Sequence, residues 1–93
     1  MYYTYILQSK KDNKYYIGST KDLRSRIYKH NKGYVRSTKS RIPFKLIYYE
    51  ISKTRQDAYR REMEIKAMKG GIQFKSLLKS SKGHRKAGSR FAG

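Results

Sequence analysis

Alternation of hydrophobic and polar side chains near the N-terminus predicts two strands. In residues 2–8 every second side chain lies on the same face of an extended chain, which puts Tyr3 and Tyr5 together. Residues 15–18 are again aromatic and β-branched, as is typical of a strand. A short polar segment with an Asp-Asn step suited to a turn separates the two runs. This close spacing predicts an antiparallel hairpin that brings Tyr5 and Tyr16 within reach of each other.

The residues after this hairpin have the pattern of a helix. Asp22 or Thr20 can cap its start by accepting hydrogen bonds from free N–H groups of the first turn. Leu23 and Ile27 are four positions apart and form the stripe that should be buried. Gly33 can take the left-handed conformation, so it marks the end of the helix.

Further hydrophobic runs predict one more strand and two more helices. A segment rich in Arg, Lys, Ser and Thr precedes them, and we expect it to be a mobile basic loop. Thr54 begins a capping box for the second helix, with Asp57 in place of the usual Glu, and Gly70 lies where that helix should close. The predicted ranges are 34–43 for the loop, 45–51 for the strand, 55–69 for the second helix and 72–79 for the third.

Composition changes at the C-terminal end of the chain. Residues 80–93 are mainly Ser, Lys, Gly, Arg and Ala, with a single Phe. Such a segment lacks the apolar surface that would order it. We therefore expect one domain at residues 1–79, followed by a disordered basic tail at residues 80–93.

The charge balance indicates a polyanionic partner. The chain has 24 Lys and Arg against 6 Asp and Glu, a net charge of +18 over 93 residues. A cationic field of this size attracts nucleic acid and displaces its condensed counterions. A ribosomal or general nucleic-acid-binding protein is the simplest interpretation of this charge alone. The absence of cysteine excludes disulfides, thiolate catalysis and cysteine-ligated zinc.

Hydropathy gives no indication of a membrane protein. No apolar run approaches the roughly 20 residues that a membrane-spanning helix needs. The apolar residues at the N-terminus are too few for the core of a signal peptide, and charged residues follow them. We therefore expect a soluble cytoplasmic protein.

Glu62 is the acidic residue whose position calls for a partner. Ala58, Glu62 and Ile65 recur at helical spacing, so Glu62 lies on the stripe that should face the core. A buried carboxylate is costly unless it is paired or binds a metal. Pairing with Lys66, four residues on, or with Arg26 from the first helix would satisfy it without a metal.

The small number of acidic residues limits the possible metal chemistry. Glu64 should point towards solvent and form a weak surface ion pair with Arg60. A two-metal phosphodiesterase needs several clustered carboxylates, which six scattered acids do not provide. One carboxylate, completed by waters and a substrate phosphate, suits a single Mg²⁺ ion.

A basic and a titratable side chain share one face of the first helix. Arg26 and His30 are four positions apart, so they project together beside the tyrosine-bearing strands. Each has a simpler explanation: Arg26 as an exposed phosphate contact, His30 as a C-terminal residue favoured by the helix dipole. Tyr5 and Tyr16 could equally be ordinary core or rim aromatics. Only the joint spacing of these residues is specific.

That joint spacing resembles the GIY-YIG nuclease family. Tyr16-Ile17-Gly18 matches the second signature of the family, and Tyr3-Thr4-Tyr5 matches the first without its glycine. The two helix motifs appear as Asp22-Leu23-x-x-Arg26-x-x-x-His30-Asn31-x-Gly33 and Ala58-x-x-x-Glu62-x-x-Ile65-Lys66. The resemblance covers residues 2–78 and is strongest to the short stand-alone bacterial members.

The resemblance implies a fold and a set of roles. The fold would be α+β, a three-stranded antiparallel sheet flanked by helices. Glu62 would hold one Mg²⁺ or Mn²⁺ ion, and Arg26 would hold the scissile phosphate. Tyr5 or Tyr16 would act as general base or orient the attacking water, with His30 assisting proton transfer. A tyrosine is a weak base at neutral pH, so we expect the surrounding cations to lower its pKa.

The sequence therefore predicts a metal-dependent endonuclease that hydrolyses phosphodiester bonds in DNA with weak sequence specificity. Structured and single-stranded DNA are the expected targets, and similar modules occur in excision-repair nucleases. A non-catalytic nucleic-acid-binding module on the same scaffold is the main alternative, and action on RNA is a third. The expected phosphate contacts, which position a protein without reading sequence, are Lys14, Arg24, Arg36, Lys39 and Arg41.

Overall fold

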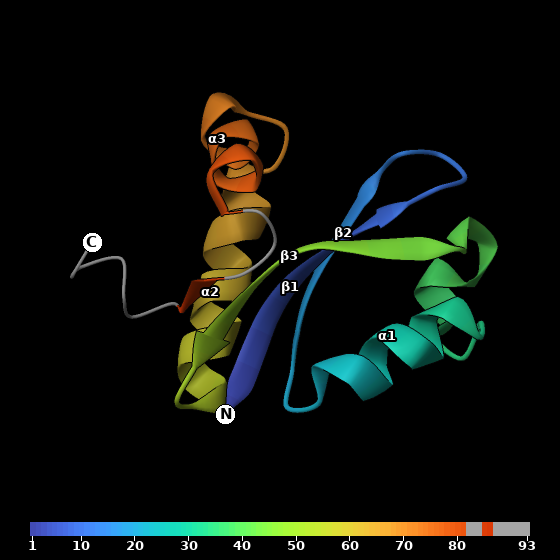
Figure 1. Ribbon diagram of the computed structural model, residues 1–93, viewed down its shortest axis with the longest axis horizontal. Coiled ribbons are helices and arrows are strands. Elements are labelled where there is room, and N and C mark those ends of the chain that lie inside the picture. The colour runs from blue at the N-terminus through green and yellow to red at the C-terminus, as the bar shows by residue number, and fades with distance from the viewer. Residues whose placement is uncertain (82–84, 87–93) are drawn as a thin grey trace.

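The computed structural model describes residues 1–81 and 85–86, and shows a twisted sheet with helices on both faces (Figure 1). The strands are β1 (Tyr2–Ser9), β2 (Tyr15–Thr20), β3 (Phe44–Ser52) and β4 (Arg85–Lys86). The helices are α1 (Leu23–Asn31), α2 (Arg55–Met68) and α3 (Ile72–Ser81), with a short 3-10 helix, η1 (Arg36–Arg41), before β3. The predicted α+β class is confirmed.

The strand order is β2-β1-β3-β4, so β2 lies at an edge of the described sheet. β1 pairs antiparallel with both β2 and β3, which confirms the predicted three-stranded antiparallel sheet. β4 adds a parallel pairing to β3 that no periodicity could predict, because two residues carry no period. Of the predicted tail, residues 80–93, the structure describes the end of α3, which continues to Ser81, and β4. The rest of the predicted tail lies outside the described residues.

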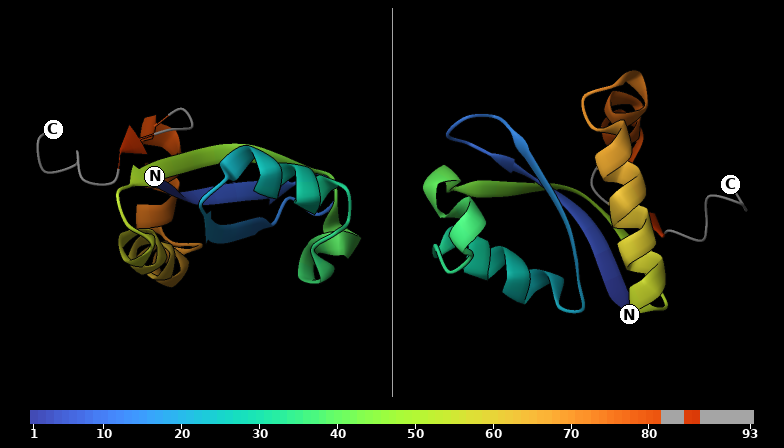
Figure 2. Two further views of the ribbon diagram at one scale, coloured as in Figure 1. Left: turned by 90° about the horizontal axis from the view of Figure 1, so that it is seen from below. Right: turned by 180° about the vertical axis from the view of Figure 1, so that it is seen from behind.

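Helices cover the two faces of the sheet with separate hydrophobic cores. Figures 1 and 2 show α1 on one side of the sheet and α2 with α3 on the other. β1 is buried on both faces because each of its two side-chain rows contacts one layer of helices. The core on the α1 side contains Tyr5, Leu7 and Phe44. The core on the α2 side contains Ile6, Ile17, Tyr48, Ile65, Phe74 and Leu77.

The helix boundaries follow the predicted capping residues. Asp22 accepts a hydrogen bond from the backbone N–H of Ser25 at 3.0 Å and caps α1. Thr54 caps α2 by the same interaction with a backbone N–H three residues on. Gly33 and Gly70 have φ values of 79° and 88°, so the predicted left-handed positions are confirmed.

The predicted mobile loop at residues 34–43 is wrong. Most of this segment forms η1, whose Thr38 is fully buried and is hydrogen-bonded to His30. The side chain of Asn31 also bonds both the N–H and the C=O of Phe44, which ties the end of α1 to β3. A basic composition predicted solvation, but these tertiary hydrogen bonds hold the segment.

Among the described residues, none of the helices is long and apolar enough to cross a membrane.

Candidate active site

Strand pairing determines where the hydroxyl of Tyr5 lies. The register of β1 and β2 sets Tyr5 opposite Gly18. A Cβ atom added to Gly18 would lie 2.7 Å from the Tyr5 hydroxyl oxygen and 2.9 Å from its Cζ atom. The missing side chain at Gly18 therefore makes room for the phenol of Tyr5 to lie across the backbone of β2.

Tyr5, Tyr16 and His30 form one cluster, as the sequence predicted. The Tyr5 hydroxyl lies 3.3 Å from Nε2 of His30. The ring of Tyr16 lies 4.8 Å from the imidazole and 6.3 Å from the ring of Tyr5, measured between centroids. Tyr5 and His30 are almost fully buried, whereas Tyr16 is partly exposed. Tyr16 is thus the member of the cluster that solvent or substrate can reach.

The hydrogen bonds around His30 assign its protons. Thr38 Oγ1 lies 2.8 Å from Nδ1 of His30 and donates to the carbonyl oxygen of Val35 at 3.3 Å. Because the single hydroxyl proton of Thr38 is used there, Nδ1 of His30 is the donor to Thr38. Nε2 then carries no proton and accepts from the Tyr5 hydroxyl.

Burial keeps this imidazole neutral. Burial, assisted by the nearby Arg26 cation, lowers the pKa of His30 to about 4. His30 does lie in the last turn of α1, but it is buried there. At neutral pH His30 acts as a hydrogen-bond acceptor for Tyr5, and a proton donated from an imidazolium is not available.

The pKa of Tyr5 shifts in the opposite direction to the prediction. Burial raises the pKa of Tyr5, with smaller contributions from Tyr16 and Glu62, and Arg26 opposes them. The attraction of the surrounding cations is thus smaller than the cost of burying a phenolate. Tyr5 stays protonated, which fits its role as donor to His30.

Glu62 reaches the same region from α2, on the other side of the sheet. Ser19 of β2 donates a hydrogen bond to Oε1 of Glu62 at 2.7 Å, and Nζ of Lys66 lies 2.8 Å from Oε2. The predicted pairing with Lys66 is confirmed, and this bond raises the pKa of Lys66. The carboxylate is close enough to Tyr5 to influence its pKa, so both helix layers meet around the edge strand.

The donor set at Glu62 fits one hard divalent cation. A carboxylate and the hydroxyl of Ser19 supply oxygen ligands, and waters and a phosphate would complete the shell that Mg²⁺ prefers. Within the described part of the chain, no three His, Cys, Asp or Glu side chains are grouped to hold a metal. Lys66 must move from Oε2 if an ion is to use both carboxylate oxygens.

Arg26 lines a groove beside Ser19, the hydrogen-bond partner of Glu62. The groove has a volume of about 770 Å³ and is lined by residues of α1, of the first half of α2 and of the end of β2. The ion pairs within residues 1–81 and 85–86 use Arg41, Arg60, Arg61 and Lys66 as cations, and Arg26 takes part in none of them. Its guanidinium is therefore available to bind a phosphate.

A buried ionic network between β3 and α2 was missed from sequence. Glu50 is 1% exposed, accepts a hydrogen bond from the Tyr48 hydroxyl, and is bound by Nε of Arg61 at 2.9 Å and 3.1 Å. Arg61 also pairs with Glu64 at 3.0 Å. The predicted partner of Glu64 was Arg60, which instead pairs with Asp57. Alternation along β3 puts Glu50 and Tyr48 on one face, and this was the available signal.

The predicted phosphate contacts do not all have free side chains. Lys14, Arg24, Arg36 and Lys39 are exposed. Arg41 instead pairs with Asp12 at 3.2 Å, donates to the carbonyl oxygen of Tyr15 and lies over the ring of Phe44. These contacts hold Arg41 in a structural role at the base of the β1–β2 turn.

Comparisons with known proteins agree with this geometry. The family model of the GIY-YIG catalytic domain matches residues 1–71. A UPF0213 protein of Staphylococcus saprophyticus is 44% identical over 66 residues, which cover 70% of this chain and 79% of that protein. UPF0213 proteins of Staphylococcus aureus are 39% identical over 66 residues, which again cover 70% of this chain and 79% of each relative. The solution NMR structure of a UPF0213 protein from Bacillus halodurans superimposes with a TM-score of 0.57 at 33% identity, covering 89% of this chain and 88% of that one.

The matched segment contains both signature strands, α1 and α2, and thus every residue of the candidate site. On the strength of this match and of the relatives that share it, the chain belongs to the GIY-YIG family.

Proposed function

We propose that this protein is a metal-dependent endonuclease that hydrolyses phosphodiester bonds in DNA. The observation that carries the proposal is the meeting of three different groups at the edge of β2. These are the carboxylate of Glu62, the guanidinium of Arg26, which takes part in no ion pair among the described residues, and the cluster of Tyr5, Tyr16 and His30. A protein that only binds phosphates needs no carboxylate at this position.

Each residue has a role that follows from its surroundings. Arg26 binds the non-bridging oxygens of the scissile phosphate and stabilises the charge that develops on them. Glu62, oriented by Ser19, holds one Mg²⁺ or Mn²⁺ ion, which when bound supplies Lewis-acid stabilisation. Tyr16 contacts the attacking water because it is the partly exposed tyrosine. His30 fixes Tyr5 by accepting a hydrogen bond from its hydroxyl group, so both are positioning residues.

One observation favours the second candidate, a nucleic-acid-binding module without catalysis. The ammonium of Lys66 already neutralises Glu62. A compensated carboxylate does not repel phosphates, so binding without metal is compatible with this geometry. Substitution of Glu62 separates the two functions.

The test is cleavage of a substrate panel with Mg²⁺ by the wild type, Glu62→Gln and Glu64→Gln. The panel holds duplex, single-stranded, flapped and junction DNA, together with RNA. Glu64 is the matched control because it lies on the same helix, exposed and paired with Arg61. We expect the wild type and Glu64→Gln to cut DNA, and Glu62→Gln to bind equally well while losing at least about a hundredfold in rate.

Two results would overturn the proposal. If the wild type binds DNA tightly but never cuts with Mg²⁺ or Mn²⁺, the binding module is the correct function. If Glu62→Gln cuts as fast as the wild type, the assigned carboxylate is wrong. Preferential cleavage of the RNA arm would keep the chemistry and replace the substrate.

A further inference from the structure

The groove beside Arg26 includes in its wall the hydrogen-bond partner of the candidate carboxylate. Ser19, the hydrogen-bond donor to Glu62, lines the groove, and so does Arg26. A nucleic-acid strand with its scissile phosphate at Arg26 must therefore continue along this groove or leave the surface. The proposed cleavage chemistry uses only Ser19 and Arg26 from the wall of this groove.

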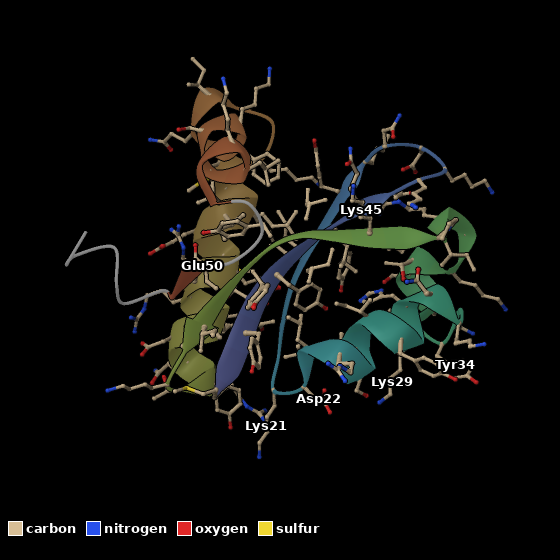
Figure 3. The ribbon with its side chains drawn as sticks, in the orientation of Figure 1. Lys21, Asp22, Lys29, Tyr34, Lys45 and Glu50 are labelled. Carbon is tan, nitrogen blue, oxygen red and sulfur yellow. The ribbon has the colours of Figure 1, made fainter. Side chains whose placement is uncertain are left out.

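Cations and an exposed aromatic ring line the remainder of the groove. Lys21, Lys29 and Arg55 are exposed and form part of its wall. Figure 3 shows Lys21 at the bend between β2 and α1, with Lys29 farther along α1. The acidic residue in the wall, Asp22, is occupied in capping α1. The groove therefore presents positive charge to an entering ligand.

Tyr59 supplies the aromatic surface. It lies on α2, lines the groove and is 56% exposed. The other tyrosine of the wall, Tyr2, already has the guanidinium of Arg55 over its ring at 5.8 Å from the centroid. Tyr59 is thus the ring available for stacking on a planar ligand.

Positive charge beside an exposed aromatic ring is the chemistry that binds an unpaired nucleotide. Bases inside a duplex have both faces covered by their neighbours, whereas unpaired bases stack on aromatic side chains. The volume of about 770 Å³ is in the range of sites that enclose a ligand of nucleotide size. A duplex could contact the rim of this groove only through its backbone.

We propose that this groove binds an unpaired nucleotide of a single-stranded nucleic acid, with the base stacked on Tyr59 and the neighbouring phosphates bound by Lys21 and Lys29. Its position next to the cut rests on the proposed function, but the binding does not. The site therefore favours single strands over duplexes.

Fluorescence anisotropy of the full chain in EDTA tests the site without any cleavage. The probes are a labelled dT octamer, an rU octamer, an abasic octamer with the same phosphates, and a 20-base-pair duplex. The variants are Tyr59→Ala, Tyr59→Phe and, as matched control, Tyr34→Ala. Tyr34 is 70% exposed and lies beyond the other end of α1 (Figure 3).

We expect Tyr59→Ala to weaken binding of the dT octamer by roughly five- to a hundredfold, the range found for loss of one stacked base. The abasic octamer and the duplex should change by less than about twofold. Tyr59→Phe, which keeps the ring, and Tyr34→Ala should bind like the wild type. The rU arm shows whether the site distinguishes DNA from RNA.

The inference is overturned if Tyr59→Ala leaves dT and rU binding unchanged, or if it weakens the abasic octamer equally. Folding of each variant is checked by its urea midpoint, and Tyr59→Phe reports on stacking if the alanine variant is unstable. Because metal is absent, failure here differs from failure of the nuclease proposal: loss of cleavage in Glu62→Gln neither requires nor implies stacking on Tyr59.

Discussion

At the residue scale, two side chains depend on what surrounds them more than on their own chemistry. The Tyr5 hydroxyl lies across β2 because Gly18 has no side chain there. His30 stays neutral because it is buried between Tyr5 and Thr38. Neither position has the properties that the same residue would have in water.

Gly18→Ala should lower the free energy of unfolding by about 1–3 kcal/mol, because the new methyl group would overlap the buried ring of Tyr5. Urea denaturation measures the change. Gly71→Ala is the control, since its Cβ would meet the carbonyl oxygen of Met68 at an ordinary 3.4 Å. Equal stability of the two variants would show that Tyr5 can move away.

His30 should make folding stability depend on pH. Its pKa falls from 6.5 to about 4 on folding, so between these values the unfolded chain binds more protons. Its contribution is therefore complete above about pH 6.5 and is lost as the pH falls towards 4, amounting to about 3 kcal/mol. Urea unfolding of the wild type and His30→Gln at pH 4.5, 5.5 and 7 measures it. The stability difference between them should shrink as the pH falls; a constant difference would contradict the assignment.

At the element scale, α2 connects the two parts of the sheet. The hydroxyl of Thr4 on β1 donates to the carbonyl oxygen of Ala58 at 2.8 Å and so anchors the helix. The neighbouring residues Arg61 and Glu62 then extend to β3 and β2 respectively. Arg61 has a structural role, whereas Glu62 belongs to the candidate site.

Removing Arg61 should be strongly destabilising because it leaves the buried carboxylate of Glu50 without its cation. We expect Arg61→Met to cost about 3 kcal/mol or more in chemical denaturation. Arg60→Met should cost less than about 0.5 kcal/mol, since the Arg60–Asp57 pair is exposed. The double variant Arg61→Met/Glu50→Gln should recover part of the loss. A small effect of Arg61→Met alone would show that the buried side chain of Glu50 does not depend on its pairing with Arg61.

At the scale of the whole molecule, the candidate site lies at an edge strand of the sheet, where side chains from both faces can meet. α1 and α2 cover opposite faces, so their side chains are separated by the sheet except around an edge strand. β2 is that strand, and both Ser19 and Gly18 lie near its end. The net charge of +18 gives the molecule as a whole an attraction for nucleic acid.

Binding should therefore weaken steeply with salt. The double variant Arg36→Gln/Lys39→Gln should reduce the slope of log K against log salt concentration. The loss of two phosphate contacts corresponds to a reduction of about 1.4 for single strands and about 1.8 for duplex DNA. The control Lys45→Gln/Lys53→Gln removes the same charge from exposed residues of β3 and the turn after it. Anisotropy titrations across a salt series give both slopes. Identical slopes for the two pairs would show that η1 does not contact phosphates.

The sequence by itself determined the first three strands, the three α-helices and their local geometry, but not η1 or β4. Patterns within a few residues predict the two strands of the N-terminal hairpin and the caps at Asp22 and Thr54. They also place Glu62 on a buried stripe of its helix. The proximity of Tyr5 and Tyr16 follows from a short hairpin. Such features depend on backbone hydrogen bonding and on side-chain periodicity, which are local properties.

Only the tertiary structure decided the electrostatics and the shape of the site. The ordering of η1 over His30, the pairing of Arg61 with Glu50 and the groove lined by Tyr59 join residues that are distant in the chain. Periodicity identifies which face of an element is buried, but not which polar groups meet there. The cost of removing a charge from water depends on every neighbour packed around it, so pKa directions and ion-pair partners emerge only when the layers are assembled.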